Sequence, residues 1–199
     1  MAAARSFDES YYRRYYEDPK TRVYSAVEHD HLASYVFAFA RWNQIEIDNV
    51  LDVGAGIGLW RDWIQKHQPK LRYTGTEVSE AMCKKHGFKQ ADIASWRDRK
   101  KYDLIICQGV LQYISDDGIE SAVANIAAMA RGLVFFEALT RGDFRERADQ
   151  ARTDSDVFLR PGSFYRSLFG QHFVTVGAGL YWPSTLELPF WELDVGGIR

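Results

Sequence analysis

Apolar side chains recur at helical spacing through the first 45 residues of the chain. The stretch Asp8–Asp18 carries four tyrosines at positions i, i+1, i+4 and i+5, which places their rings on one helical face. These are Tyr11, Tyr12, Tyr15 and Tyr16. Pro19 predicts the end of this helix, because proline cannot continue the hydrogen-bonded ladder. A second helix is predicted over Ser25–Gln44, where apolar residues again follow the helical period.

The pattern then changes to short apolar runs that alternate with amphipathic stretches. The apolar runs predict strands at Asn49–Val53, Leu71–Thr76, Phe88–Ile93, Tyr102–Cys107 and Leu133–Ala138. The stretches between them predict helices at Gly58–His67, Ser79–His86 and Asp116–Arg131. Ser79 and Ser115 are placed to begin the last two helices, and Gly87 and Gly132 to end them. This order of strands and helices, with short links, predicts a parallel sheet with right-handed crossovers.

The rest of the chain has a weaker pattern. Thr140–Arg160 is polar and charged without a clean period, and it is interpreted as a mobile lid or an irregular helix. A short helix is predicted over Ser163–Phe169, followed by a hairpin of Phe173–Leu180 and Leu186–Val195, joined through Pro183, at the sheet edge. We expect one domain over residues 1–199, with a helical annex at 1–45, a core at 46–138 and a lid segment with the hairpin at 139–199.

Composition narrows the class of protein. The chain has 199 residues, 46% of them hydrophobic, and a net charge of −2, so it lacks the basic surplus typical of nucleic-acid binding. Its two cysteines are not in a CxxC pattern, which argues against zinc and favours a reducing, cytoplasmic setting. We expect no signal peptide and no membrane span, because no apolar run approaches the ~18 residues that a bilayer requires.

The sequence VLDVGAGIGLW, residues 50–60, joins the first predicted strand to the next helix. Its glycines stand at Gly54, Gly56 and Gly58, where they permit a sharp turn and let a ligand approach the backbone. The spacing is GxGxG, whereas the nicotinamide-dinucleotide fingerprint GxGxxG needs a third glycine at position 59, which is Leu59. No GK[ST] follows, which excludes a Walker loop.

Two acidic residues follow at the ends of the next two predicted strands. Glu77 lies 23 positions after Gly54, where an acid accepts hydrogen bonds from ribose hydroxyls in dinucleotide folds. Asp92 follows the third strand, where it is placed to accept from an adenine amino group while Ile93 packs on the ring. Together these positions predict a site for an adenosine without a phosphate chain.

These motifs, with YDLIICQGVLQYI at residues 102–114, resemble the class I S-adenosylmethionine-dependent methyltransferases of the small-molecule type. The resemblance covers roughly residues 46–138. It implies a Rossmann-like α/β fold with a seven-stranded, mostly parallel sheet, an antiparallel last strand and helices on both faces. It also implies S-adenosyl-L-methionine as cofactor and S-adenosyl-L-homocysteine as product.

Residue by residue, the resemblance implies the following roles. Asp52 organises the glycine loop and helps hold the methionine amino group, Glu77 binds the ribose, and Asp92 with Ile93 contacts adenine. The implied cofactor set is Asp52, Gly54, Ala55, Gly56, Gly58, Glu77, Val78, Asp92, Ile93, Gln108 and Gly109. Tyr16 and Arg22 are added as candidates because N-terminal helices in the family often fold over the cofactor. The alternative, that the tyrosine face only packs on the sheet, stays open.

The segment after the fourth strand bears on the methyl acceptor. It reads QGVL, without the [DN]PP[YF] motif of nucleic-acid enzymes, the aspartate of magnesium-dependent catechol-type enzymes or the glutamate pair of protein arginine enzymes. We therefore expect a small-molecule O-, N- or C-methyltransferase that uses no metal and acts as a monomer or homodimer. Glu137 and His29 are the candidates for a substrate-contacting base, with His31 and His172 behind them.

Three alternatives remain open at this point. The chain is alternatively a cofactor-binding, non-catalytic partner protein or a protein methyltransferase. A nicotinamide-dependent oxidoreductase is disfavoured by the GxGxG spacing and by the absence of a Tyr-x-x-x-Lys motif.

Overall fold

The computed structural model describes residues 7–191, which form a seven-stranded sheet with helices around it. The strands are β1 (Asn49–Val53), β2 (Arg72–Glu77), β3 (Lys89–Gln90), β4 (Tyr102–Gln108), β5 (Ala130–Glu137), β6 (Phe173–Gly177) and β7 (Leu180–Pro183). Their order across the sheet is β3-β2-β1-β4-β5-β7-β6. All neighbouring strands run parallel except β7, which is antiparallel to both β5 and β6. The predicted fold class is confirmed.

The helices follow the amphipathic stretches of the sequence. They are α1 (Glu9–Tyr12), α2 (Ala26–Trp42), α3 (Leu59–His67), α4 (Glu80–His86), α5 (Asp116–Met129), α6 (Arg141–Glu146) and α7 (Gly162–Phe169). A π-helix, η1 (Arg13–Glu17), continues α1, and a 3₁₀ turn, η2 (Leu111–Tyr113), follows β4. None of these helices is both long enough and apolar enough to cross a bilayer.

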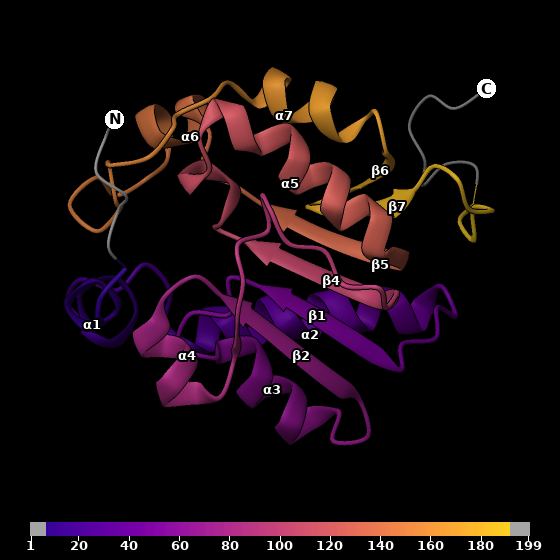
Figure 1. Cartoon of the computed structure of the whole chain (residues 1–199), viewed down its shortest axis with the longest axis horizontal. Helices are drawn as coiled ribbons and strands as arrows, with labels where there is room; N and C mark the ends of the chain where they lie inside the picture. The colour runs from indigo at the N-terminus through magenta and orange to yellow at the C-terminus, as the bar shows by residue number, and fades with distance from the viewer. Residues whose placement is uncertain (1–6, 192–199) are drawn as a thin grey trace.

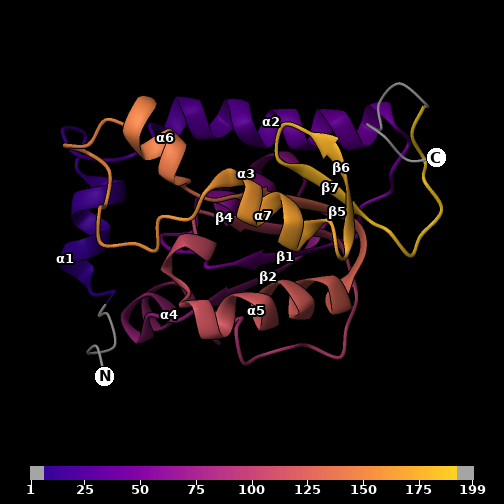
Figure 2. The same ribbon diagram turned by 90° about the horizontal axis from the view of Figure 1, so that it is seen from above.

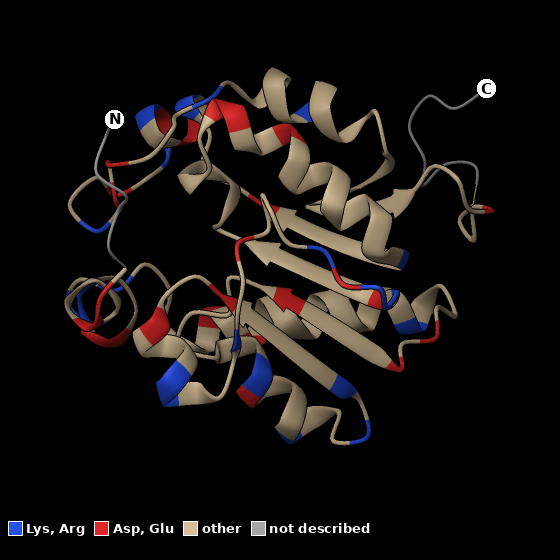
Figure 3. Ribbon diagram, in the orientation of Figure 1, with Lys and Arg blue, Asp and Glu red and all other residues tan. Residues whose placement is uncertain are grey.

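Each face of the sheet has its own apolar core. Helices α2 and α3 bury residues such as Phe37 and Trp63 against one face of the sheet. Helices α5 and α7 bury Ile126 and Phe169 among the side chains of the other face. Figure 2 shows α2 and α5 on opposite sides of the strands. Figure 3 shows charged residues mainly on helices, loops and strand ends, as a sheet covered on both faces requires.

The N-terminal helices begin with side-chain caps. The carboxylate of Asp8 accepts a hydrogen bond from the Tyr11 N–H at 2.9 Å, so the predicted helix starts where the sequence indicates. Ser25 and Glu28 form a capping box at the start of α2. The tyrosine face of α1 and η1 turns toward the carboxyl ends of the parallel strands, and Figure 1 shows the arrowheads of β4 and β5 pointing to the side where α1 and α6 lie.

The predicted strand Phe88–Ile93 is wrong in length. Strand β3 is the sheet edge and pairs with β2 at only two positions, through Lys89 and Gln90. The chain then turns at Asp92, whose carboxylate accepts the Ala94 N–H at 2.9 Å and whose carbonyl accepts the Trp96 N–H at 2.7 Å. These local bonds compete with strand pairing, as aspartate commonly does.

The predicted end of the fifth helix at Gly132 is also wrong. Helix α5 ends at Met129, and Gly132 lies within β5. A Cβ atom at Gly132 would lie 2.3 Å from the backbone oxygen of Asp103 on the neighbouring β4. This glycine therefore permits close strand approach and does not terminate the helix.

The predicted C-terminal hairpin is misplaced. Its strands are β6 and β7, and the turn lies at Gly177, Ala178 and Gly179, which have φ angles of 123°, 45° and 83°. Glycine takes such angles readily, so the two glycines fix the turn, and Pro183 is the last residue of β7. Residues 186–191 form no strand, and the rest of the predicted Leu186–Val195 lies outside the described residues. The Thr140–Arg160 segment contains one short helix, α6.

Candidate active site

The glycine loop lies between β1 and α3 and adopts a backbone that favours glycine. Gly54, Gly56 and Gly58 have φ angles of 70°, 55° and 87°, in the left-handed region that L side chains rarely adopt. A Cβ atom at Gly54 would lie 2.4 Å from the Cγ2 atom of Val110. The loop is therefore a narrow backbone cradle at the carboxyl edge of the sheet, where open α/β sheets bind ligands.

Glu77 ties the end of β2 to this loop. Its side chain is 3% exposed. One carboxylate oxygen, Oε2, accepts the Gly56 N–H at 2.9 Å, and the other, Oε1, accepts the Val78 and Ser79 N–H groups at 2.7 and 3.0 Å. The ring of Tyr12 covers the same place, because its Cε1 atom lies 3.4 Å from where a Gly56 Cβ would be. Burial and the charge of Glu77 raise the pKa of Tyr12.

The other acids predicted for the cofactor lie in different surroundings. Asp52 is 2% exposed and accepts a hydrogen bond from the Tyr73 hydroxyl at 2.6 Å. Burial raises the pKa of Asp52 to about 7 although this hydrogen bond opposes the shift. Asp92 is exposed, and Ile93 is 4% exposed within the core under α5. The structure thus places Asp92 and Glu77 at adjacent strand ends and turns Ile93 into the core.

A chain of hydrogen bonds crosses the ends of β4 and β5. The Trp60 indole N–H donates to Gln108 Oε1 at 2.8 Å, and Gln108 Nε2 donates to Glu137 Oε2 at 3.3 Å. The Tyr24 hydroxyl donates to the other oxygen of Glu137. The Gly109 N–H donates to the Glu137 carbonyl at 2.8 Å. Burial raises the pKa of Glu137, and the hydrogen bonds from Tyr24 and Gln108 oppose that rise.

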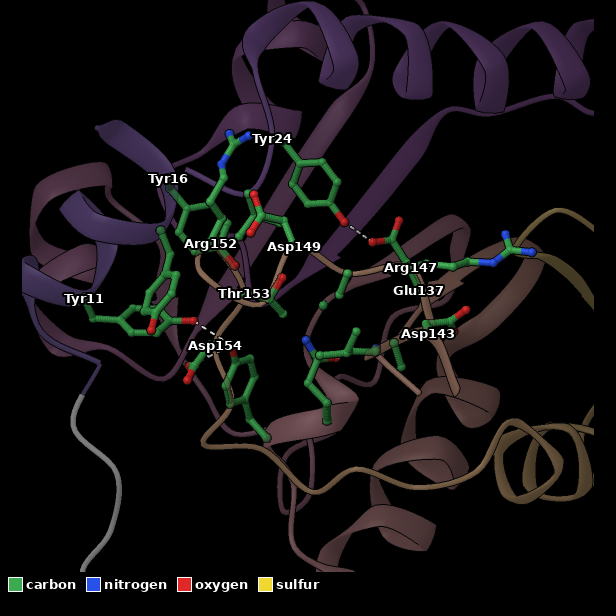
Figure 4. A pocket seen from close by; sticks show the side chains of 18 residues that line it. Tyr11, Tyr16, Tyr24, Glu137, Asp143, Arg147, Asp149, Arg152, Thr153 and Asp154 are labelled. Carbon is green, nitrogen blue, oxygen red and sulfur yellow. Dashed lines mark hydrogen bonds between the residues drawn. The ribbon is translucent and has the colours of Figure 1, made fainter. Parts of the chain in front are cut away.

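A cavity of about 390 Å³ opens above Glu137 (Figure 4). Its walls come from residues 11–24, from the segments that follow β4 and β5, and from residues 143–154. The Tyr11 and Tyr113 hydroxyls lie 2.9 Å apart, and Tyr113 donates to Asp154 at 3.1 Å. These bonds join the N-terminal helix, the turn after β4 and the polar segment into one enclosure.

Some of the predicted residues line this cavity and others do not. Tyr16, Gly109 and Glu137 do. His29 lies outside the lining, 4% exposed, with its ring 5.0 Å from that of Trp60, and burial lowers its pKa to about 4. Arg22 is also outside it, and its carbonyl oxygen accepts a hydrogen bond from Arg152.

The other residues of the predicted cofactor set differ in exposure. Ala55 and Gly58 are buried, whereas Val78 is 43% exposed. Cavity residues that no motif singles out include Tyr24, Gln112 and Tyr113, whereas the lining residues between 143 and 154 belong to the polar segment that was interpreted as a lid or an irregular helix. Tyr113 stands in the quoted segment after β4, but no spacing rule distinguishes it. Within residues 7–191, no three His, Cys, Asp or Glu side chains converge as a metal site requires.

A family model described as "Methyltransferase domain" matches residues 13–172. The chain belongs to this methyltransferase family. It is an S-adenosylmethionine-dependent methyltransferase of class I, and its seven-stranded, mostly parallel sheet with an antiparallel β7 is the fold that the resemblance implies. No curated protein is significantly similar to the chain.

Several solved structures share the fold of this methyltransferase. The sugar N-methyltransferase KedS8 from Streptoalloteichus sp. is 19% identical over 76% of this chain and 85% of that chain, with a TM-score of 0.60. DesVI from Streptomyces venezuelae is 18% identical over 78% and 91%, with a TM-score of 0.59. The N-methyltransferase NodS from Bradyrhizobium japonicum, solved with S-adenosylhomocysteine, is 14% identical over 77% and 86%, with a TM-score of 0.57. The methyltransferase spans about half (52%) of a similar Clostridium acetobutylicum S-adenosylmethionine-dependent methyltransferase.

The residues of the methyltransferase fit S-adenosylmethionine. Gly54, Gly56 and Gly58 carry no side chains, so the backbone of the loop can lie close to a ligand at the carboxyl edge of the sheet. Glu77 presents a buried carboxylate, an acceptor-only group that suits ribose hydroxyls.

Proposed function

We propose that this methyltransferase transfers the methyl group of S-adenosylmethionine to a small-molecule acceptor in the cavity above Glu137. One observation carries the proposal: Glu137 and Gly109 line an enclosure of about 390 Å³, and Val110, the residue after Gly109, lies against Gly54 of the glycine loop. A volume of this size is typical of small-ligand pockets. Structures of similar fold include a sugar N-methyltransferase, KedS8, which supports an acceptor of modest size.

We assign cofactor binding to the loop and the strand ends. Gly54 and Gly56 pass beside the methionine part, Glu77 accepts from the ribose hydroxyls, and Asp92 lies toward the adenine. When bound, the cofactor supplies a methyl group on a positively charged sulfur. Gln108 is the last residue of β4 and Gly109 is the next residue; both lie between this site and the cavity, because β4 lies between β1 and β5 in the sheet.

Glu137 is the residue we assign to the acceptor. Its carboxylate is fixed on one side by Tyr24 and on the other by Gln108, which Trp60 orients in turn. It is thereby placed to hold the acceptor and to take the proton that the attacking atom must lose. Alignment of two bound reactants in a closed site contributes about 7–11 kcal/mol to such displacements. The proposal requires no metal.

The test separates three outcomes. S-adenosylhomocysteine is titrated into the protein by calorimetry, with NADH as control. The protein is then incubated with methyl-labelled S-adenosylmethionine and a cell extract divided by ultrafiltration into small-molecule and macromolecular pools. Label in the small-molecule pool, lost in Glu137→Gln and kept in the exposed control Glu146→Gln, supports the proposal. Label only in the macromolecular pool indicates a protein methyltransferase, and binding without label indicates a non-catalytic partner protein.

A further inference from the structure

Acidic side chains outnumber basic ones on the cavity walls. Four carboxylates line the cavity, and two guanidinium groups do. The acids are Glu137, Asp143, Asp149 and Asp154. Glu137 is the last residue of β5, at the end of the cavity next to the sheet, and Asp154 is only 6% exposed. The acids are therefore spread from the inner end to the rim.

The charged ends of both arginines point elsewhere. Arg152 donates from its guanidinium to the carbonyl oxygen of Arg22. The pKa of Glu28, at the start of α2, is lowered by hydrogen bonds from Ser25 and further by the positive charges of Arg152 and Arg22. The Arg152 charge thus lies beside that helix terminus. Arg147 is exposed, and Figure 4 shows its guanidinium on the far side of Glu137 from the tyrosines.

Aromatic rings make up much of the remaining wall. Five tyrosines line the cavity: Tyr11, Tyr15, Tyr16, Tyr24 and Tyr113. The ring centroids of Tyr11 and Tyr15 are 5.0 Å apart, and those of Tyr11 and Tyr16 are 6.2 Å apart. The faces of such rings carry partial negative charge and attract cations. Rings and carboxylates therefore favour the same sign of ligand charge.

We infer that the methyl acceptor is a primary or secondary amine that enters this cavity as an ammonium ion. This inference rests on the proposed function, since it names the substrate class of the same site. The Glu137 backbone carbonyl accepts the Gly109 N–H, so the Glu137 carboxylate lies at the ends of β4 and β5, where the cavity approaches the cofactor site. The ammonium nitrogen binds there, and the tyrosine rings cover the carbon atoms that it carries. An acceptor that bears a carboxylate or phosphate meets like charge at Glu137 and along residues 143–154.

The chemistry balances with groups already present. The ammonium R–NH₃⁺ gives one proton to the Glu137 carboxylate and becomes R–NH₂. The nitrogen lone pair forms the new N–C bond to the methyl carbon, and the electron pair of the breaking C–S bond stays on sulfur, which becomes neutral. The product leaves as R–NH₂–CH₃⁺, and Glu137 returns its proton to water.

The experiment uses three compounds with one carbon frame: cyclohexylamine, cyclohexanol and cyclohexanecarboxylate. Binding of S-adenosylhomocysteine to the full chain is measured first, and each compound is then titrated into the saturated complex at neutral pH by calorimetry and ligand-observed NMR. We expect the amine to bind about tenfold more tightly than the alcohol, and the carboxylate not to bind. Glu137→Gln removes the preference, Asp149→Asn at the rim weakens it, and Asp117→Asn on the outside of α5 leaves it unchanged.

Each result decides between two proposals. If the amine binds no better than the alcohol or the carboxylate while S-adenosylhomocysteine binds normally, the amine inference is overturned and the methyltransferase function stands. Failure of all three compounds to bind the saturated complex overturns the inference in the same way. Failure of S-adenosylhomocysteine to bind overturns the proposed cofactor site and the inference that rests on it.

Discussion

Glu77 is the residue on which the cofactor assignment depends most. Its carboxylate accepts backbone N–H bonds from Gly56, Val78 and Ser79 at 2.9, 2.7 and 3.0 Å. In Glu77→Gln the amide oxygen keeps the two bonds of Oε1, but the amide nitrogen faces the Gly56 N–H as a second donor. A hydrogen bond to a charged group contributes about 1.5–3 kcal/mol, so we expect a loss of about 2 kcal/mol in the free energy of unfolding. For a chain of this size that loss lowers Tm by about 4–8 °C.

The same substitution weakens cofactor binding. With the carboxylate gone, a ribose hydroxyl loses its charged acceptor, at a cost of about 1–3 kcal/mol. This corresponds to a rise of about 5- to 150-fold in the Kd of S-adenosylhomocysteine, measured by calorimetry. Glu80→Gln is the matched control. Glu80 lies exposed on α4 and forms an i,i+4 ion pair with Lys84, so both Tm and Kd should stay near those of the wild type.

Two results would contradict this reasoning in different ways. A lower Tm with wild-type affinity means that Glu77 only holds the loop and that the ribose binds elsewhere. A wild-type Tm with wild-type affinity means that the three backbone bonds contribute nothing measurable, and the account of the loop itself fails.

Three further predictions concern neighbouring residues. Gly54→Ala places an alanine at a φ angle of 70°, which costs about 1–2 kcal/mol of stability before the overlap with Val110 is counted. The second substitution Val110→Ala relieves the overlap but not the backbone strain, so thermal unfolding of the double variant should show only partial recovery. Asp52 binds a proton more tightly in the folded state, because its pKa is about 7 there against 3.8 in the unfolded chain. The free energy of unfolding therefore falls by up to about 4 kcal/mol as pH rises between these values. In Asp52→Asn this dependence on pH disappears, as denaturant titrations at several pH values would show. Tyr24→Phe removes a hydrogen bond that lowers the pKa of Glu137, so the acidic limb of the pH–rate profile shifts to higher pH.

Each of these has an outcome that counts against it. Full recovery of stability in the Gly54→Ala, Val110→Ala double variant would show that the backbone conformation contributes nothing. An unchanged pH slope in Asp52→Asn would mean that Asp52 is ionised in the folded protein. If the acidic limb of the pH–rate profile does not shift in Tyr24→Phe, a group other than Glu137 takes the proton.

Most of the sheet could be predicted because its signals are local. The limits of β1 are those expected, since an apolar run is followed at once by the glycine loop. The limits of β3 could not be predicted, because an edge strand is as long as its single neighbour permits. Gly132 shows the same difficulty: its role depends on Asp103 of the adjacent strand, which no reading of the local sequence reveals.

The residues of the site also fall into two groups, those that local sequence predicts and those that depend on distant contacts. The glycine loop and Glu77 were predicted from spacing, because they lie at the ends of consecutive strands. Tyr24 and Tyr113 were missed because their partners are distant in sequence: Tyr24 bonds Glu137, 113 positions away, and Tyr113 lies against Tyr11, 102 positions away. Only tertiary packing brings these pairs together, and the local sequence pattern around each residue does not reveal its partner.

The two halves of the site are built from different parts of the chain. The glycine loop and Glu77 sit on β1 and β2 near the middle of the sheet, whereas the cavity walls come mainly from residues 11–24 and 143–154, outside it. Substitutions in these outer segments can therefore alter which molecule is modified while the strands beneath stay unchanged. Replacing both segments with those of a relative of similar fold would therefore change the acceptor preference, while the same sheet continues to bind the cofactor.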